Sequence, residues 1–563
     1  MTGLFLAEFG GLDWAIVVGY MLGVLGLGAL VSGKSEDQED YFLGGRSMPT
    51  WAVTLSVLAT SLSAATYVGV PQMTFAAGGD LSYLILNVGG LLGTVAVAWL
   101  FLPRLYAAGT TTIYGALEQR HGEGGVIAAS VAFLFGRFLA SGARLFIAGI
   151  AFSHLLFDDL STPSIVTAIV LFGVVGTAYT CMGGIRAVIW TDTLQILLVV
   201  GAALASIWFL LDAIPLGVGE LWDVLQQDEK LTVVKSGFGP TGYDWAAGYT
   251  ILTAFAVIPQ YMGSYGCDQD LVQRMLTTKS AWRSSLSLVV SQVIGIPVVL
   301  LFLVIGLLLS VFYGHPELMG AAAPHDALLD DRGVYPQFLK NHMPTGLAGL
   351  AMAGMFAAAM SSLDSAVNAL ASSLVADVIR PLKRHLGGEA AATPTAPALP
   401  SVAPQEPGVS ATPGSPFSPP TTAEPGREAP RSTPDEDLGA PRIAVVASGA
   451  ILVVFAVVAA LVQQGGKTRL IDFALGVMTF ALSGLLGVFL ATLLTKRGNV
   501  YSLIAALIAG AVAIFVIQKA TPLAWPWWML FSTPVSFGVC CLGSPRSAEP
   551  RGEVKAEGGV GVQ

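Results

Sequence analysis

The chain has 563 residues, of which 54% are hydrophobic and only 12% are charged. Its mean hydropathy of +0.69 indicates a multi-pass membrane protein and excludes a soluble globular one. The formal net charge of −9 points to no particular partner, because the charged residues lie mostly in the loops. We find no nucleophile–base pair, metal cluster or nucleotide motif, so the sequence predicts neither an enzyme nor a nucleic-acid-binding protein.

Apolar runs long enough to cross a hydrocarbon core of ~30 Å recur along the chain. They are continuous rather than alternating, which excludes a β-barrel and predicts an all-α protein. We expect about thirteen transmembrane helices, near residues 13–33, 49–75, 81–107, 126–156, 162–182, 187–213, 245–264, 284–313, 345–380, 442–464, 468–493, 499–517 and 523–543.

Positive charges are unevenly distributed between the two sides. With the N-terminus outside, the inner loops and the C-terminal tail hold 19 of the 28 Lys and Arg residues. This bias follows the positive-inside rule and predicts an external N-terminus in a cell membrane, as in a bacterial inner membrane. The first helix has acidic residues at its start, Glu8 and Asp13, unlike a signal peptide, so we expect it to be retained.

The composition changes once, at residues 386–441, which carry 13 of the 31 prolines. We expect a disordered cytoplasmic linker there, between nine helices in residues 1–385 and four in residues 442–543. Residues 544–563 are polar and Gly-rich, and we expect a disordered tail. The two long outer loops, before the seventh and ninth helices, are apolar enough to fold as short helices. The four cysteines show no metal-ligand or disulfide pattern and are expected to pack.

The ninth predicted helix carries a polar stripe. Ser361, Ser365, Asn368 and Ser372 fall on one helical face. In a membrane such a face either packs closely against another helix or lines a path for a hydrated solute. Its oxygens would suit a hard cation such as Na⁺. From this pattern alone, packing and ion binding both remain open.

Two spans contain residues that can interrupt a helix. The span at 49–75 has many small hydroxyl residues and ends in Gly69 and Pro71, and the span at 245–264 contains Pro259. A membrane helix can unwind where its freed carbonyl groups face a cavity or an ion. Two interrupted helices five spans apart are what an inverted five-helix repeat would produce.

Three motifs occur in order: GGIRAVIWTDTLQ at 183–195, GCDQDLVQR at 266–274 and the small-residue run at 354–378. They resemble the motifs of the sodium:solute symporter family, and the resemblance covers roughly residues 13–517. It implies a leucine-transporter-like fold, in which the second to eleventh helices form two inverted five-helix repeats. It also implies Na⁺-coupled uptake of a solute by alternating access.

The resemblance also implies a sodium site between the first and eighth helices of this core. Its ligands map to the carbonyl oxygens of Ala59, Leu62 and Ala358 and the hydroxyl groups of Ser361 and Ser362. Some family members build a second sodium site on an aspartate that corresponds to Asp192. A hydroxyl that helps there is replaced by Ala358, and Asp192 could instead pair with Arg186 or cap a helix.

The polar residues that sugar transporters of the family use are mostly missing from this chain. The third core helix instead carries Arg137 and Arg144 on one face, and arginine suits carboxylate recognition. Some relatives use an arginine there for a sialic acid carboxylate. We assign seven residues to the solute site: Thr66, Asn87, Ser141, Arg144, Tyr261, Ser264 and Tyr265.

We therefore expect a Na⁺-coupled symporter that imports a small organic carboxylate. One alternative is a symporter for a sugar or another neutral solute. The other is a solute-sensing receptor that signals through the linker. The expected partners are the solute, Na⁺ and membrane lipid, and the expected functional unit is a monomer.

Overall fold

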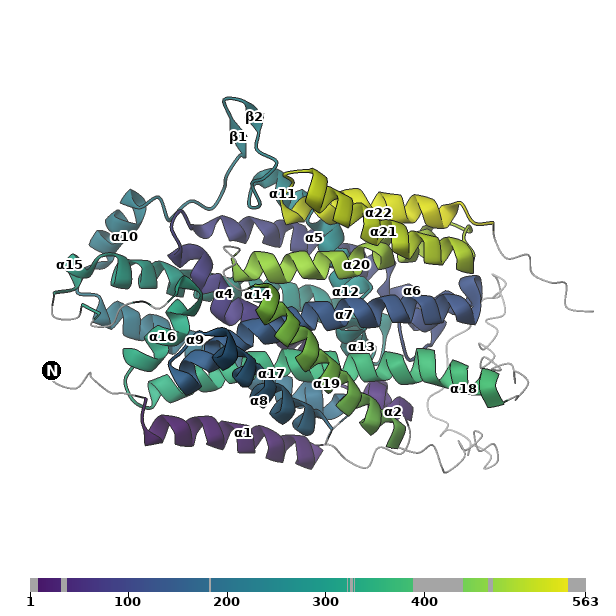
Figure 1. Cartoon of the computed structure of the whole chain (residues 1–563), viewed down its shortest axis with the longest axis horizontal. Coiled ribbons are helices and arrows are strands. Elements are labelled where there is room, and N and C mark those ends of the chain that lie inside the picture. The colour runs from purple at the N-terminus through teal and green to yellow at the C-terminus, as the bar shows by residue number, and fades with distance from the viewer. Residues whose placement is uncertain are drawn as a thin grey trace, which may run out of the picture.

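The computed structural model describes residues 9–31, 38–181, 184–320, 323–324, 328, 330–387, 439–463 and 469–544. Most of the predicted linker and all but the first residue of the predicted tail lie outside these ranges. The described residues are mostly helical (Figure 1). The first part of the chain forms α1 (Gly11–Val31), α2 (Gln38–Leu43), α3 (Thr50–Ser61), α4 (Ala64–Phe75), α5 (Leu86–Leu100), α6 (Leu102–Ala108), α7 (Glu118–Phe157), α8 (Thr162–Thr180), α9 (Ile185–Ala213) and α10 (Val218–Gln227).

A short antiparallel hairpin follows, β1 (Phe238–Gly239) and β2 (Gly242–Tyr243), with Phe238 opposite Tyr243. The remaining helices are α11 (Ile251–Ala256), α12 (Ile258–Gly266), α13 (Gln269–Met275), α14 (Ala281–Gly314), α15 (Pro316–Met319), α16 (Val334–Asn341), α17 (Leu347–Ser373), α18 (Arg380–Gly387), α19 (Gly439–Val462), α20 (Leu470–Leu494), α21 (Val500–Ala520) and α22 (Trp525–Cys541). Helices α10, α15 and α16 lie at one end of the molecule, and α2, α6 and α18 at the other (Figure 1).

Each predicted span coincides with a helix or with neighbouring helices of the structure. Among the described residues, eight helices are long and apolar enough to cross a membrane, or up to ten if each bent pair counts as one span. Helices α8 and α22 and the α11–α12 segment fall short of that length or apolarity. The structure thus confirms a helical protein with many membrane spans, and the number thirteen stays a prediction.

Both helices that were expected to be interrupted are interrupted. The axes of α3 and α4 meet at 57°, because Leu62 and Ser63 have extended backbone angles and the Ser63 side chain caps α4. Pro71 lies inside α4 rather than at the break. The other segment, 245–264, divides into α11 and α12. Helix α13 follows it, and Asp268 caps α13 by accepting from the amide of Asp270.

Helix α17 runs through the centre of the protein and packs against α9, α1 and α7. Every residue of it from Ala351 to Ser373 is buried. At its start the amides of Gly346 and Gly349 each donate to Asp13 Oδ1 at 2.7 Å. The acidic residue that distinguishes α1 from a signal peptide therefore anchors α1 to the central helix.

The two long outer loops contain short elements, as expected: α10 and the hairpin in the first, α15 and α16 in the second. The first loop also clasps the end of α4. Lys230 Nζ donates to the carbonyl oxygens of Thr74 at 2.7 Å and Ala76 at 3.3 Å, and Lys235 pairs with Asp80 at 2.5 Å. Since the carbonyl end of a helix attracts cations, Lys230 stabilises α4 where it leaves the core.

Candidate ion and solute site

The break between α3 and α4 frees backbone oxygens. In the described chain no backbone amide donates to the carbonyl oxygens of Ala59 and Leu62, because Leu62 and Ser63 leave the helical pattern. Both carbonyl groups belong to buried residues. A buried carbonyl group inside a membrane protein needs a partner, and an ion can supply one. Ala59 and Leu62 are two of the predicted sodium ligands.

The other three predicted ligands lie on α17. Ser362 Oγ donates to the carbonyl oxygens of Ala358 at 2.9 Å and Ala359 at 3.1 Å. Ser361 Oγ donates to Asp192 Oδ1 at 2.6 Å. A hydroxyl group that donates its proton keeps lone pairs with which to bind a cation, so neither bond prevents ligation.

Helices α17 and α3 meet beside the break, where Thr60 Oγ1 lies 3.4 Å from Ser365 Oγ. The five predicted ligands thus come from two adjoining elements. Together they offer three carbonyl and two hydroxyl oxygens and no formal charge. Such a set suits Na⁺, which takes neutral oxygen ligands and must later be released.

Asp192, in α9, is completely buried. It accepts hydrogen bonds from Ser56 Oγ and Ser361 Oγ, both at 2.6 Å, and pairs with Arg274 Nη2 at 3.1 Å. Its ionic partner is therefore Arg274 of α13, not the Arg186 considered from the sequence. Three residues already use this carboxylate, so a second sodium ion at Asp192 would compete with the ion pair.

A chain of buried charges continues from Arg274. Its Nη1 lies 2.9 Å from Asp270 Oδ1, Asp270 also pairs with Arg137 of α7, and Arg137 Nη1 lies 2.6 Å from Asp268 Oδ2. None of these side chains is more than 3% exposed. We call Asp192, Arg274, Asp270, Arg137 and Asp268 the buried charge chain. It begins beside Ser361 and ends at a cavity.

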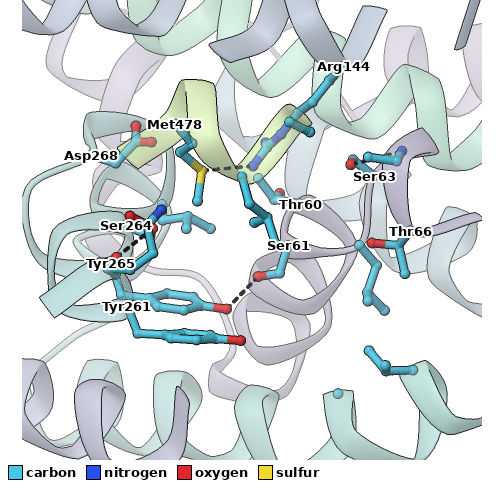
Figure 2. A pocket seen from close by; sticks show the side chains of 18 of the residues that line it. Thr60, Ser61, Ser63, Thr66, Arg144, Tyr261, Ser264, Tyr265, Asp268 and Met478 are labelled. Atoms are coloured by element: carbon cyan, nitrogen blue, oxygen red, sulfur yellow. Dashed lines mark hydrogen bonds between the residues drawn. The ribbon is translucent and has the colours of Figure 1, made fainter. Parts of the chain in front are cut away.

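That cavity has a volume of ≈130 Å³ and lies at the break between α3 and α4, facing α5, α7, α12, α14 and α20 (Figure 2). We call it the solute cavity. Six of the seven predicted solute residues line it: Thr66, Asn87, Arg144, Tyr261, Ser264 and Tyr265. Ser141 does not. It lines a neighbouring cavity of ≈10 Å³ together with Arg144 and Ser362, so Arg144 borders the solute cavity and the sodium-site helix alike.

Arg144 and Arg137 both line the solute cavity, but they differ in their partners. The one hydrogen bond of Arg144 in the described chain is from Nη2 to the sulfur of Met478, at 3.3 Å (Figure 2). A thioether is a weak acceptor. Arg137, in contrast, pairs with two carboxylates. Arg144 is therefore the guanidinium group that is available to an anion in the cavity.

Uncharged polar groups complete the cavity wall. Tyr261 and Tyr265 lie parallel with ring centroids 6.3 Å apart, and the Tyr265 hydroxyl lies 3.0 Å from Ser61 Oγ (Figure 2). Gln260 is only 3% exposed, and among the described residues neither of its amide atoms has a hydrogen-bond partner. A buried amide without partners is costly. Gln260 can thus receive a hydrogen bond from, and donate one to, a bound solute.

The sequence did not assign roles to four of these residues: Gln260, Asp268, Asp270 and Arg274. One local signal was present, because Asp270 and Arg274 stand four residues apart, as in a helical ion pair. No local signal joins Arg274 to Asp192, which is 82 residues away, and nothing around Gln260 indicates a cavity.

Comparison with known proteins identifies the family of the chain. Residues 41–390, well over half of the chain, match the model of the sodium:solute symporter family. The chain belongs to this family. Its members are transporters, and this symporter accordingly couples the movement of a solute to Na⁺ across a membrane.

Two curated relatives show the range of solutes. The chain is 28% identical over 386 residues to the sodium/sialic acid symporter SiaT of Proteus mirabilis, covering 67% of this chain and 73% of that protein. It is 28% identical over 385 residues to the human sodium-coupled monocarboxylate transporter 1, covering 66% of this chain and 60% of that one.

A solved structure of a Na⁺-coupled sialic acid symporter, in a substrate-bound outward-open state, is similar with a TM-score of 0.74. It is 21% identical and covers 96% of this chain and 100% of its own. The predicted leucine-transporter-like fold is thereby confirmed. A likeness at this identity shows the fold alone, and the solute of this symporter is a matter for proposal.

Proposed function

We propose that this symporter imports a small organic carboxylate together with Na⁺. The observation that carries the proposal is the guanidinium group of Arg144, which borders the solute cavity and, within the part of the chain that the structure describes, has only a thioether as its hydrogen-bond partner. A charged donor in a low-dielectric cavity favours an anion, and the planar guanidinium group matches a carboxylate. The relatives named for sialic acid and monocarboxylates agree, since both kinds of solute carry a carboxylate.

We assign Na⁺ to the carbonyl groups of Ala59, Leu62 and Ala358 and the hydroxyl groups of Ser361 and Ser362. The freed carbonyl groups at the helix break support this assignment. The coupling is explained by proximity, because Arg144 lies beside Ser362 in the small neighbouring cavity. A carboxylate on Arg144 would attract a cation at the break, and each would favour binding of the other.

The first test is thermal stability of the detergent-purified protein with matched pairs of ligands. Pyruvate is compared with pyruvamide, nicotinate with nicotinamide, and sialic acid with a neutral sugar, each in NaCl and in choline chloride. A ligand at a hundred times its dissociation constant should stabilise the protein by about 2.7 kcal/mol. The proposal requires that at least one acid stabilises in NaCl alone and that its neutral counterpart does not.

A neutral solute is the second candidate, and one observation favours it. The buried amide of Gln260 lies in the cavity wall with both atoms unpaired, and amides recognise hydroxyl and carbonyl groups without regard to charge. If a neutral compound stabilises as well as its acid, this candidate replaces the carboxylate. Stabilisation by Na⁺ with neither would instead leave a sodium site without an identified solute class.

A further inference from the structure

A second cavity, of ≈490 Å³, lies away from the solute site. It is bounded by α6, the first turn of α7 and the last turns of α20. Three cationic side chains line it: Arg104 of α6, Arg120 of α7 and Lys496, which lies two residues beyond the end of α20. We call it the basic cavity. Helix α6 lies at the end of the molecule that also holds α2 and α18 (Figure 1), where the positive-inside rule places the cytoplasm.

No acidic side chain lines the basic cavity, and in the described chain no carboxylate pairs with any of its three cations. Arg104 Nη1 donates to Leu100 O at 2.8 Å. Arg120 Nη1 donates to Thr492 O at 2.6 Å and to the neighbouring carbonyl groups of Ala491 and Thr495. Since a guanidinium group carries five N–H donors, each arginine keeps several for a ligand.

The rest of the wall is largely apolar. Ala107, Ala108 and Leu493 are at least partly exposed apolar residues beside the three cations, whereas Phe101, Leu105 and Phe489 are buried. The cavity is therefore amphipathic, with positive charge gathered over a hydrocarbon surface. Two other inner-side cations, Arg283 and Arg384, are as exposed as Arg104 and Lys496 but line no part of this cavity. A general excess of inner positive charge does not by itself explain why three cations from separate elements surround one hollow.

We propose that the basic cavity binds a phosphate-bearing anion. A phosphate group offers several anionic oxygens that separate cations can share, and basic pockets between membrane helices on the cytoplasmic side suit phospholipid headgroups. The same chemistry is offered by the headgroup of an anionic phospholipid and by free phosphate. The apolar part of the wall favours the lipid, whose first acyl carbons would lie against Ala107, Ala108 and Leu493.

The test uses the full-length protein in detergent and two variants. The first, Arg104→Gln/Lys496→Gln, removes two cavity charges and spares Arg120, which holds the end of α20. The matched control, Arg283→Gln/Arg384→Gln, removes two exposed inner charges elsewhere. All four positions are exposed, so both variants should fold, and their unliganded melting temperatures check this. Binding is titrated with short-chain phosphatidylglycerol, short-chain phosphatidylcholine and inorganic phosphate.

We expect phosphatidylglycerol to bind more tightly than phosphatidylcholine. The cavity variant should bind it about thirtyfold more weakly, from about 1 kcal/mol for each basic residue, and the control should match the unchanged protein. A loss of the same size for inorganic phosphate would assign free phosphate as the ligand. Equal binding of both lipids, equal loss in both variants, or no binding of any probe would overturn the proposal.

Discussion

Arg137 and Arg144 lie on one helix, seven residues apart, and both reach the solute cavity. Arg137 is held by Asp268 and Asp270, whereas the only acceptor that Arg144 contacts in the described ranges is the sulfur of Met478. Residue type and helical position are the same, so the neighbouring side chains decide the role. Arg137 stabilises the fold through its two ion pairs, and Arg144 is the group that we expect to contact the solute.

The first prediction concerns Arg144. Arg144→Lys keeps the positive charge but loses the two parallel N–H donors of the guanidinium group. Arg144→Gln loses the charge as well as this pair of donors. Charged hydrogen bonds contribute about 1.5–3 kcal/mol, so we expect the half-saturation constant for carboxylate uptake to rise at least tenfold, more for Gln than for Lys. Uptake into proteoliposomes measures it, with Arg283→Lys as the control. Unchanged uptake by Arg144→Gln would exclude a contact between Arg144 and the carboxylate.

The second prediction concerns Gln260, whose buried amide has no partner. Gln260→Met keeps the approximate volume and removes the unpaired polar atoms. Because such atoms cost about 1–3 kcal/mol, the solute-free variant should melt at the same or a higher temperature. Solute affinity should fall about tenfold, with Na⁺ activation unchanged. A variant that is less stable yet binds solute normally would show that Gln260 has a structural role only.

The family resemblance was enough to choose five residues that line the solute cavity: Thr66, Asn87, Tyr261, Ser264 and Tyr265. That they bind a solute stays a prediction. Ser141 shares a helical face with Arg144 but opens to the smaller cavity instead. The spacing of residues along a helix determines the direction in which each side chain points, but it does not determine which side chains of other helices lie next to it. The residues that surround Ser141 could therefore not be predicted from the sequence, and for the same reason Gln260 could not be identified as a cavity residue.

At the scale of elements, α3 beside its break and the buried charge chain meet at Ser365, whose Oγ lies 3.4 Å from Thr60 Oγ1 and accepts a hydrogen bond from Arg274. The break frees carbonyl groups, and the charge chain connects α9, α13 and α7 behind them. The segment that supplies Arg274, Asp270 and Asp268 directly follows the second interrupted helix. The first interrupted helix and the segment after the second thus provide polar groups to one region, where a continuous helix would use its carbonyl groups internally.

The third prediction tests the pair of Asp192 and Arg274 by a double-mutant cycle. Removing one partner of a buried ion pair costs about 3–5 kcal/mol, so Asp192→Asn and Arg274→Gln should each lower the melting temperature strongly. The double variant should be clearly more stable than the sum of the single effects predicts. The measurement is thermal unfolding in detergent for the four proteins.

The partly exposed pair of Arg332 and Asp330 serves as the matched control, with side chains 23% and 29% exposed. Such pairs contribute about 0–1 kcal/mol, so its cycle should show little coupling. Strict additivity for Asp192 and Arg274 would mean that the ion pair is not formed in the folded protein.

The fourth prediction concerns the outer loops, which His315 joins. Its Nε2 lies 2.9 Å from Asp228 and its Nδ1 3.0 Å from Glu317. Both nitrogen atoms can donate only in the charged form. The hydrogen bond with Asp228, above all, raises the pKa of His315. The contribution of His315 to stability is therefore fully present below the unfolded pKa of about 6.5 and is lost as the pH rises through the higher folded pKa.

We expect amide hydrogen exchange in residues 218–230, corrected for its intrinsic pH dependence, to be slower at pH 6 than at pH 8.5. His315→Gln should abolish this difference, and His385→Gln, near the opposite end of the chain's long axis, should keep it. Protection that does not change with pH would show that the imidazole does not tie the loops together.

At the scale of the whole molecule, the apolar runs were sufficient to predict the helices, since a membrane requires long apolar segments with internally paired backbones. They could not predict how the helices pack. Helix α19, beyond the predicted linker, packs against α7, α8 and α17, so both sides of the linker build one body. Nor could the apolar runs predict the hydrogen bond from Lys230 to the end of α4, because loop residues follow no periodic pattern.

The fifth prediction follows from the charge of the whole site. The three carboxylates of the buried charge chain are balanced by Arg274, Arg137 and the nearby Arg144. A bound carboxylate adds one negative charge, and one Na⁺ in the neutral oxygen site cancels it. Since Arg274 and two hydroxyl groups already use Asp192, we expect one Na⁺ per carboxylate and no net charge moved.

Proteoliposomes with a potential set by K⁺ and valinomycin measure this directly. A tenfold Na⁺ gradient, about 1.4 kcal/mol, should support about tenfold accumulation of the solute at zero and at 100 mV, inside negative. A second Na⁺ would add about 2.3 kcal/mol of driving force at 100 mV. The accumulation at 100 mV would then be about fiftyfold higher than at zero potential. That outcome would require Asp192 to exchange Arg274 for Na⁺ during the cycle, and the buried charge chain would then be a moving part of transport.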